Sequence, residues 1–300
     1  MTNSTRTNRP TPFRARAVVG RVVPGACLAA ALMMGVATQA SEDGLGGKDK
    51  IVVATAGENK APKDAGGGSR HSTALWRYSG KKGPESWGTL SKDYALCKSG
   101  AMQSPIDIAG STGASTQPIR FDYGLTPLSI VHNGHTVMVS YAPGSSITVG
   151  GKRYELVQFH FHTPSEHSVS GKRAAIEMHL VHKAADGELA VIAVLFSGGA
   201  KNLALGEIAT YLPMKPGPVK VNRRVLVNAR DLLPAKRGYY RYIGSLTTPP
   251  CSEGVQWFVM AQPVPVQASV VARFTQALGY SARPIQALNR RLLLAPIARD

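Results

Sequence analysis

The sequence predicts a mainly β fold, with one domain built on a large, mostly antiparallel twisted sheet and a few short peripheral helices. Short runs rich in β-branched residues recur along the chain, and several of them alternate apolar and polar side chains with a period of two. Turns rich in Gly, Asn and Pro separate these runs. The 20 Pro among 300 residues suit loops between strands better than long helices.

Each expected element follows from its local pattern. Strands are predicted over residues 129–132, 136–141, 146–149, 157–162, 176–182, 189–196 and 255–260. The run 189–196 is continuously apolar, which is typical of a strand buried on both faces. Helices are predicted over 202–211 and 266–278, and Gly279 ends the second.

The first forty residues have the pattern of a cleavable export signal. A basic stretch with five Arg and no acidic residue precedes an apolar run from Cys27 to Ala37, and Thr38-Gln39-Ala40 is a small-residue cleavage site. The run is short for a transmembrane helix, so we expect no membrane span after cleavage, with an uncleaved anchor as the alternative. The mature protein is therefore expected in the periplasm or secreted.

Residues 41–70 are rich in Gly and charged residues and are predicted to form a flexible tether. The remaining residues, 71–300, contain no second linker and are long enough for one sizeable core. We therefore expect a single domain over 71–300.

The formal net charge is +17, of which the signal carries five charges. A nucleic-acid partner is not expected, because the basic residues are spread out, no aromatic residues interleave with them, and the protein is exported. A weak attraction to an anionic envelope surface is the milder inference. A solvated basic surface without any partner is an equally good interpretation of this charge.

Cleavage would remove Cys27 and leave Cys97 and Cys251. An even pair in an exported protein predicts one disulfide, worth about 2–5 kcal/mol because it closes a long loop. Two unpaired buried thiols are the alternative.

Three histidines have the spacing of metal ligands. His160 and His162 are two positions apart, so both rings leave one face of a strand. His179 lies in the next apolar run, beyond a turn at residues 170–173, and a hairpin would bring it beside the pair. Three imidazoles that converge in this way make a zinc site with an open fourth position, the arrangement that activates water.

Polar residues next to these histidines are candidates for orienting them. Gln158 and Glu177 each lie two positions before a ligand, so each is predicted to accept the second N–H of a neighbouring ring. Solvent-facing strand residues are the alternative. His167 and His182 are interpreted as structural. His71 and His132 are interpreted as surface histidines. For His135 a surface histidine is one interpretation, and a histidine near the metal that relays protons is the other.

A second segment, Tyr242 to Cys251, holds two threonines followed by two prolines, a rigid extended turn. It is either a stiff loop or a device that fixes a threonine hydroxyl beside the metal, where the hydroxyl would donate to a buried carboxylate. Glu166 is the candidate carboxylate.

Taken together, these segments resemble the alpha class of carbonic anhydrases. The shared segments span roughly residues 74–293 and are Gln103 to Ile106, Asn133-Gly134-His135, Gln158 to His162, Ser165-Glu166-His167, Glu177 to His182 and Gly244 to Pro250. The resemblance implies that family's sheet with zinc in a conical cleft, and reversible hydration of carbon dioxide to bicarbonate by zinc-bound hydroxide.

The resemblance also implies roles for individual residues. The zinc ligands would be His160, His162 and His179, and the catalytic residues Thr247, Glu166 and the proton shuttle His135. Supporting residues around the ligands would be Gln158, Glu177, His167 and Tyr242. The carbon dioxide pocket would hold Val181, Val191, Leu246, Thr248 and Trp257. Cys97 and Cys251 match the disulfide pair of bacterial exported members.

Two positions depart from the family pattern: Ser281 replaces a usual asparagine, and Met138 a common polar residue of the cleft. Rival hypotheses are a non-catalytic binding protein, a zinc-dependent esterase (which is also a side activity of the same site) and a periplasmic zinc carrier. Dimers are common among bacterial relatives, but the sequence gives no interface.

Overall fold

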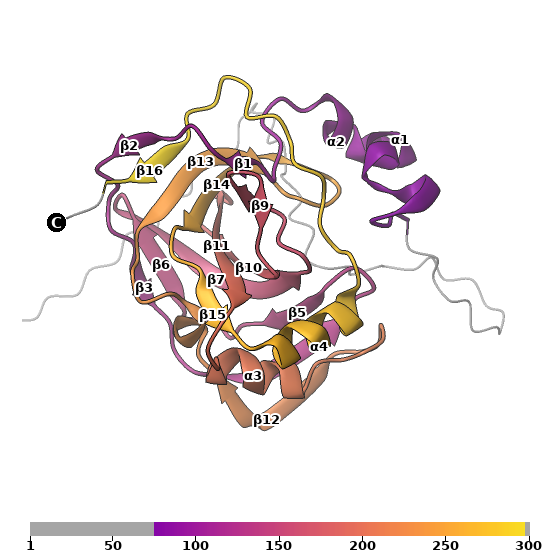
Figure 1. Ribbon diagram of the computed structural model, residues 1–300, viewed down its shortest axis with the longest axis vertical. Helices are drawn as coiled ribbons and strands as arrows, with labels where there is room; N and C mark the ends of the chain where they lie inside the picture. The colour runs from indigo at the N-terminus through magenta and orange to yellow at the C-terminus, as the bar shows by residue number, and fades with distance from the viewer. Residues whose placement is uncertain (1–74, 298–300) are drawn as a thin grey trace, which may run out of the picture. The chain divides into compact units, whose positions relative to one another are not determined.

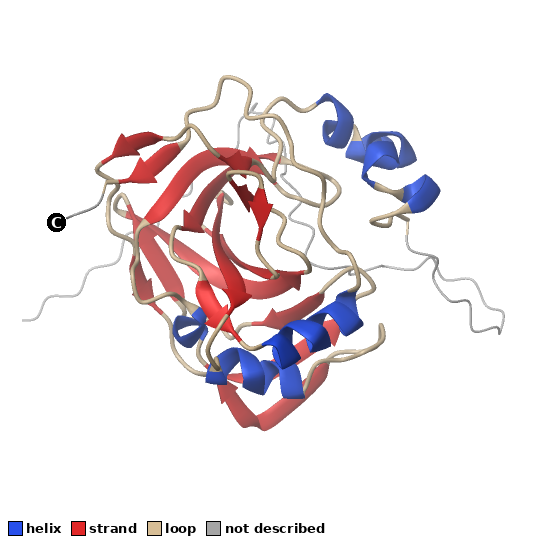
Figure 2. Ribbon diagram, viewed as in Figure 1, coloured by secondary structure: helices blue, strands red, loops and turns tan. Residues whose placement is uncertain are grey.

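The computed structural model describes residues 75–297, so the expectations for the signal, for the tether and for His71 lie outside the described residues. The predicted fold is confirmed: a large mixed sheet dominates, and the helices are short and peripheral (Figures 1 and 2). No helix within 75–297 is long and apolar enough to cross a membrane.

The large sheet has 13 strands, in the order β12-β4-β5-β7-β10-β11-β14-β13-β16-β2, with β15 beside β11, β6 beside β7 and β3 beside β6. Its strands are β2 (Thr112–Ala114), β3 (Arg120–Asp122), β4 (Thr126–His132), β5 (Val137–Ser140), β6 (Ser146–Val149), β7 (Lys152–His162), β10 (Ile176–Lys183), β11 (Leu189–Gly198), β12 (Lys220–Val227), β13 (Tyr239–Ser245), β14 (Glu253–Met260), β15 (Val264–Val266) and β16 (Leu294–Pro296). A small sheet holds β1 (Asp107–Ile108), β8 (Ser168–Val169) and β9 (Lys172–Arg173).

The helices are α1 (Trp87–Leu90), α2 (Leu96–Ser99), α3 (Leu203–Thr210) and α4 (Ala268–Leu278), with 3-10 turns η1 (Gly80–Lys82), η2 (Pro84–Ser86), η3 (Lys92–Tyr94) and η4 (Ala229–Leu232). Both predicted helices are present. The Asn202 side chain caps α3 by accepting the Leu205 N–H at 2.8 Å. Gly279 ends α4 with a φ of 61°, a conformation that favours glycine.

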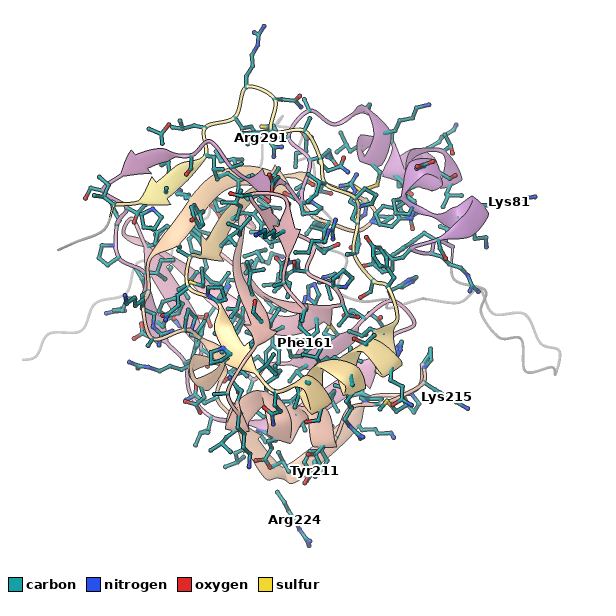
Figure 3. The ribbon with its side chains drawn as sticks, in the orientation of Figure 1. Lys81, Phe161, Tyr211, Lys215, Arg224 and Arg291 are labelled. Carbon is teal, nitrogen blue, oxygen red and sulfur yellow. A yellow bond between two sulfur atoms is a disulfide. The ribbon has the colours of Figure 1, made fainter. Side chains whose placement is uncertain are left out.

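The central strands β10 and β11 are almost wholly buried because both faces of the sheet are covered. Alternate residues enter different clusters: Leu180 and Ile192 join the large core, whereas Val181 and Val191 join a second cluster with Trp257. Phe161, on β7, is fully buried in the large core (Figure 3). The continuously apolar run of the sequence therefore serves two cores at once.

The residues before the sheet form a third small cluster, in which Trp76 and Trp87 pack around the disulfide. Cys97 and Cys251 are bonded, with an S–S distance of 2.08 Å across 154 residues, as predicted. The bond fastens α2 to the loop that follows Thr247 and Thr248, and it fits an oxidising compartment.

Candidate active site

The predicted hairpin brings the three histidines together. Strands β7 and β10 are antiparallel, with His179 opposite His160 and Glu177 opposite His162. The ring centroid of His160 lies 5.1 Å from that of His162 and 5.2 Å from that of His179. The turn predicted at 170–173 joins β8 to β9. Strands β7 and β10 pair as their alternation predicts.

In each of the three rings, one nitrogen is already engaged in a hydrogen bond. The Nδ1 of His160 donates to Gln158 Oε1 at 2.9 Å, and the Nδ1 of His162 donates to the Ser281 carbonyl oxygen at 2.7 Å. The Nε2 of His179 donates to Glu177 Oε1 at 2.7 Å. These bonds fix the tautomers and leave one lone pair free on each ring.

The free nitrogens meet at one place. Ligand atoms of His160, His162 and His179 lie within 4.8 Å of one another. Burial, and then the neighbouring rings, lower the pKa of His160 well below its usual value, and burial lowers that of His162. Both rings are therefore neutral at pH 7, which is the form that binds a metal.

Glu177 is the centre of a buried network behind His179. Its carboxylate also accepts the His167 main-chain N–H at 2.8 Å and the His167 Nδ1–H at 2.6 Å. The Tyr242 hydroxyl lies 2.7 Å from His167 Nε2 and 2.9 Å from the Ser104 hydroxyl. Burial alone would raise the pKa of Glu177, but electrostatic attraction and hydrogen bonds from His167 and His179 hold that pKa well below its usual value.

Glu166 is fully buried beside the ligands. Its Oε1 accepts the Arg283 main-chain N–H at 2.8 Å. Its Oε2 has no hydrogen-bond partner among the described residues and lies 3.4 Å from His162 Nε2, which also lacks one. Since the His162 proton is on Nδ1, two lone pairs face each other here, an arrangement that a cation stabilises. The histidines and these orphaned atoms therefore fit a zinc ion.

The expected hydrogen bond between the Thr247 hydroxyl and Glu166 is not formed in this structure, because Oε2 is unpartnered and Oε1 accepts only from Arg283. Thr247 is nevertheless buried, with 5% of its surface exposed. Its loop is held on both sides: the Leu246 N–H donates to Ser252 at 3.0 Å, and the Cys251 N–H donates to Thr248 at 2.9 Å.

Gly244 lets this loop approach the network closely. A Cβ at this position would lie 2.1 Å from the Ser104 hydroxyl oxygen and 2.9 Å from the Trp257 ring, so no larger residue fits. Strand β13 ends at Ser245, so this close packing lies directly before the loop that holds Thr247 and Thr248.

Four of the predicted pocket residues lie in one apolar cluster. Val181, Val191 and Trp257 are buried, Leu246 packs against them, and the Trp257 ring lies 4.9 Å from the His179 ring. Thr248 lies next in the loop and is partly buried. The cluster is an uncharged wall beside the histidines.

His135 is stacked on Trp76, with ring centroids 3.7 Å apart and planes 10° apart. Burial, followed by electrostatic interaction with Arg77 and His132, lowers its pKa to about 4. The ring is therefore neutral at pH 7 in this position.

The interpretation of His132 as a surface residue is wrong. Its side chain is buried, its Nδ1 accepts the Gly134 N–H at 3.1 Å, and its Nε2 donates to the Ala277 carbonyl oxygen at 3.0 Å. Both ring nitrogens are used because β4 lies against the end of α4. His182 is buried as expected, bonded to the Tyr123 hydroxyl at 2.7 Å.

Sequence reasoning missed two residues that hold the site. The Arg283 guanidinium is 1% exposed and donates to Gln103, to the Ser104 carbonyl and to the Cys97 carbonyl, while its main chain holds Glu166. Trp76 stacks on His135. Neither position has a local pattern that signals its role.

Comparisons with known proteins agree with this geometry. The family model for eukaryotic-type carbonic anhydrases matches residues 82–296. A carbonic anhydrase of Nostoc is 42% identical over 234 residues, covering 76% of this chain and 89% of the relative. The solved alpha-carbonic anhydrase of Thermovibrio ammonificans, in complex with the inhibitor sulfanilamide, is 42% identical, with a TM-score of 0.71 over 73% of this chain and 98% of its own.

A second similar structure, the alpha-carbonic anhydrase of Photobacterium profundum, is 43% identical with a TM-score of 0.69, and covers 73% of this chain and 99% of its own. The chain therefore belongs to the eukaryotic-type, or alpha-class, carbonic anhydrases. These enzymes are lyases that hydrate carbon dioxide.

Proposed function

We propose that this chain hydrates carbon dioxide reversibly to bicarbonate and a proton, with a zinc ion held by His160, His162 and His179. The observation that carries the proposal is the set of three free ring nitrogens turned to one place, each ring fixed by a hydrogen bond on its other nitrogen. Zinc bound by three histidines supplies a nucleophile at neutral pH by lowering the pKa of a bound water from about 16 to about 7.

We infer that Thr247 and Glu166 orient the nucleophile. The unpartnered Oε2 of Glu166 is a suitable acceptor for the Thr247 hydroxyl proton. A threonine hydroxyl that donates its proton to this carboxylate can only accept on its other side. It would therefore accept a hydrogen bond from the nucleophile and set the direction in which the nucleophile attacks carbon dioxide. The Arg283 main-chain N–H keeps the carboxylate in place.

Carbon dioxide is apolar and uncharged, and the wall of Val181, Val191, Leu246 and Trp257 suits it. The wall offers few hydrogen bonds to the charged product, which favours release of bicarbonate. Thr248, in the adjoining loop, is the polar residue at the edge of this pocket.

His135 is the proposed proton shuttle. While it is stacked on Trp76, its pKa of about 4 makes it a weak base at pH 7. Moving off Trp76 into water would remove the burial and return the pKa toward about 6.5, where it matches a proton relay. We therefore expect His135 to leave the stack during turnover.

Replacing His135 with alanine is expected to lower turnover in dilute buffer by about a hundredfold and to leave kcat/KM for carbon dioxide nearly unchanged. Stopped-flow hydration assays at low and high buffer concentration measure both quantities. Added imidazole should restore most of the lost turnover. A variant that is equally fast in dilute buffer, or slow and not rescued, contradicts the shuttle role.

Gln158 is proposed to raise zinc affinity by fixing the His160 ring. Gln158→Ala is expected to weaken zinc binding about tenfold, measured by competition with a chelator. Glu155→Ala, on the exposed side of the same strand, is the matched control and should bind zinc normally. Equal affinity of both variants would contradict the orienting role.

We further propose that residues 1–40 are an export signal cleaved after Ala40 and that the mature protein works in the periplasm. The Cys97–Cys251 bond supports an oxidising compartment. Mass spectrometry of the exported protein tests the cleavage site.

The proposed cofactor is tested by metal analysis of the purified protein. One zinc per chain is expected, lost on treatment with a chelator at reduced pH and regained on adding zinc salt. A folded chain that neither contains nor takes up zinc contradicts the proposal.

A further inference from the structure

The strongest feature outside the active site is a basic surface on strand β12. Residues 75–297 hold 24 Lys or Arg against 12 Asp or Glu, and the 20 residues from 211 to 230 contain five of the basic residues and no acidic one. A short stretch therefore carries five of the twelve net positive charges of the described domain.

These charges are exposed and uncompensated. Lys215, Lys220, Arg223, Arg224 and Arg230 are all exposed, and within 75–297 none of their side chains forms an ion pair or a hydrogen bond. In Figure 3, Arg224 projects away from the ribbon at the lower end of the molecule, near Tyr211, and Lys215 lies above it on the right-hand side. Lys81 and Arg291 lie far from that end in the same view.

Apolar side chains interrupt the charges. Val219 is 55% exposed and Val221 is 57% exposed, on either side of Lys220. Lys220 lies opposite Ile130 of β4 and Val221 opposite Ser129, so these two side chains leave opposite faces of the edge strand and both are presented at the sheet edge. Lysine on an edge strand has a simpler explanation, which is that it prevents aggregation. The exposed valines beside it would promote aggregation, so that explanation does not account for this edge.

We propose that Lys215, Val219, Lys220, Val221, Arg223 and Arg224, the β12 surface, dock the protein on a bilayer that contains anionic phospholipid. Apolar side chains that enter the headgroup boundary, flanked by cations that meet phosphates, are the two components of peripheral membrane binding. A second copy of the chain is a poor occupant, since it would set four cations against four.

An acidic peptide added as a further strand is also disfavoured. The register of β12 against β4 is broken between Asn222 and Leu226, which leaves only three regular residues, Lys220 to Asn222, before the break. Three residues give too short a ladder to hold an added strand. A bilayer needs no register, so the bulge that projects Arg223 and Arg224 favours it.

The test compares two triple variants that remove the same charge. The β12 variant replaces Lys220, Arg223 and Arg224 with glutamine. The control variant replaces the exposed Lys81, Lys92 and Lys98 with glutamine, and these residues lie on or near the short helices before the sheet. Partitioning of the mature protein, from which residues 1–40 have been removed, onto vesicles is measured by sedimentation, using phosphatidylcholine alone and in equal parts with phosphatidylglycerol, at low and high salt.

The β12 variant is expected to partition about a hundredfold more weakly onto phosphatidylglycerol vesicles, since each cation near an anionic leaflet contributes about fivefold. The control variant should bind nearly as the parent does, and both should keep full hydration activity. The same loss in both variants would assign binding to diffuse net charge. Unchanged binding in the β12 variant, or binding to DNA and not to vesicles, would also overturn the proposal.

Discussion

Replacing His160 with alanine is expected to abolish stable zinc binding and to lower carbon dioxide hydration by about a thousandfold or more. Within residues 75–297 the site offers three histidine ligands, and two histidines bind zinc too weakly to retain it against dilution. Metal analysis after gel filtration, together with stopped-flow hydration, measures both effects.

The control for this variant is Val157→Ala, three residues earlier on β7, where the side chain is 36% exposed. It should keep zinc and activity. Thermal unfolding of both metal-free variants separates loss of the ligand from loss of the fold. A His160→Ala protein that still holds one zinc per chain and hydrates carbon dioxide at the parental rate would contradict the assignment of the ligands.

Replacing Thr247 with alanine is expected to leave zinc content unchanged and to lower kcat/KM for carbon dioxide by about a hundredfold. The hydroxyl would act on the direction of attack and not on metal binding, because Thr247 is not among the three ligands. Stopped-flow hydration of zinc-loaded protein measures the effect.

Thr247→Ser retains the hydroxyl and should recover most of the activity, whereas Thr247→Val, which keeps the shape, should not. Glu166→Gln should resemble Thr247→Ala in rate, since it removes the carboxylate that accepts the threonine proton. Full activity in Thr247→Val would rule out the orienting role.

The sequence predicted the strands that carry the ligands because their pattern is local. Alternation in 157–162 and 176–182 set which side chains share a face, and the pairing of His160 with His179 followed. Strands β12 and β13 were not predicted. Lys220 to Arg224 have no buried residue, and in Tyr239 to Arg241 only Tyr239 is buried, so their strand state comes from pairing with β4 and β14.

Contacts between distant segments escaped prediction for a different reason. The partner of His162 is the carbonyl oxygen of Ser281, 119 residues away, and every residue type has that atom. The replacement of asparagine by serine there is therefore harmless to this hydrogen bond. The burial of His132 depends on α4 lying against it, which no pattern around Asn133-Gly134 reveals.

The central claim is most directly tested by stopped-flow hydration of carbon dioxide by the purified protein, before and after zinc is removed by a chelator and again after zinc is restored. Fast hydration that disappears with the metal and returns with it is the predicted result. A folded protein that holds one zinc per chain and does not accelerate hydration would contradict the account.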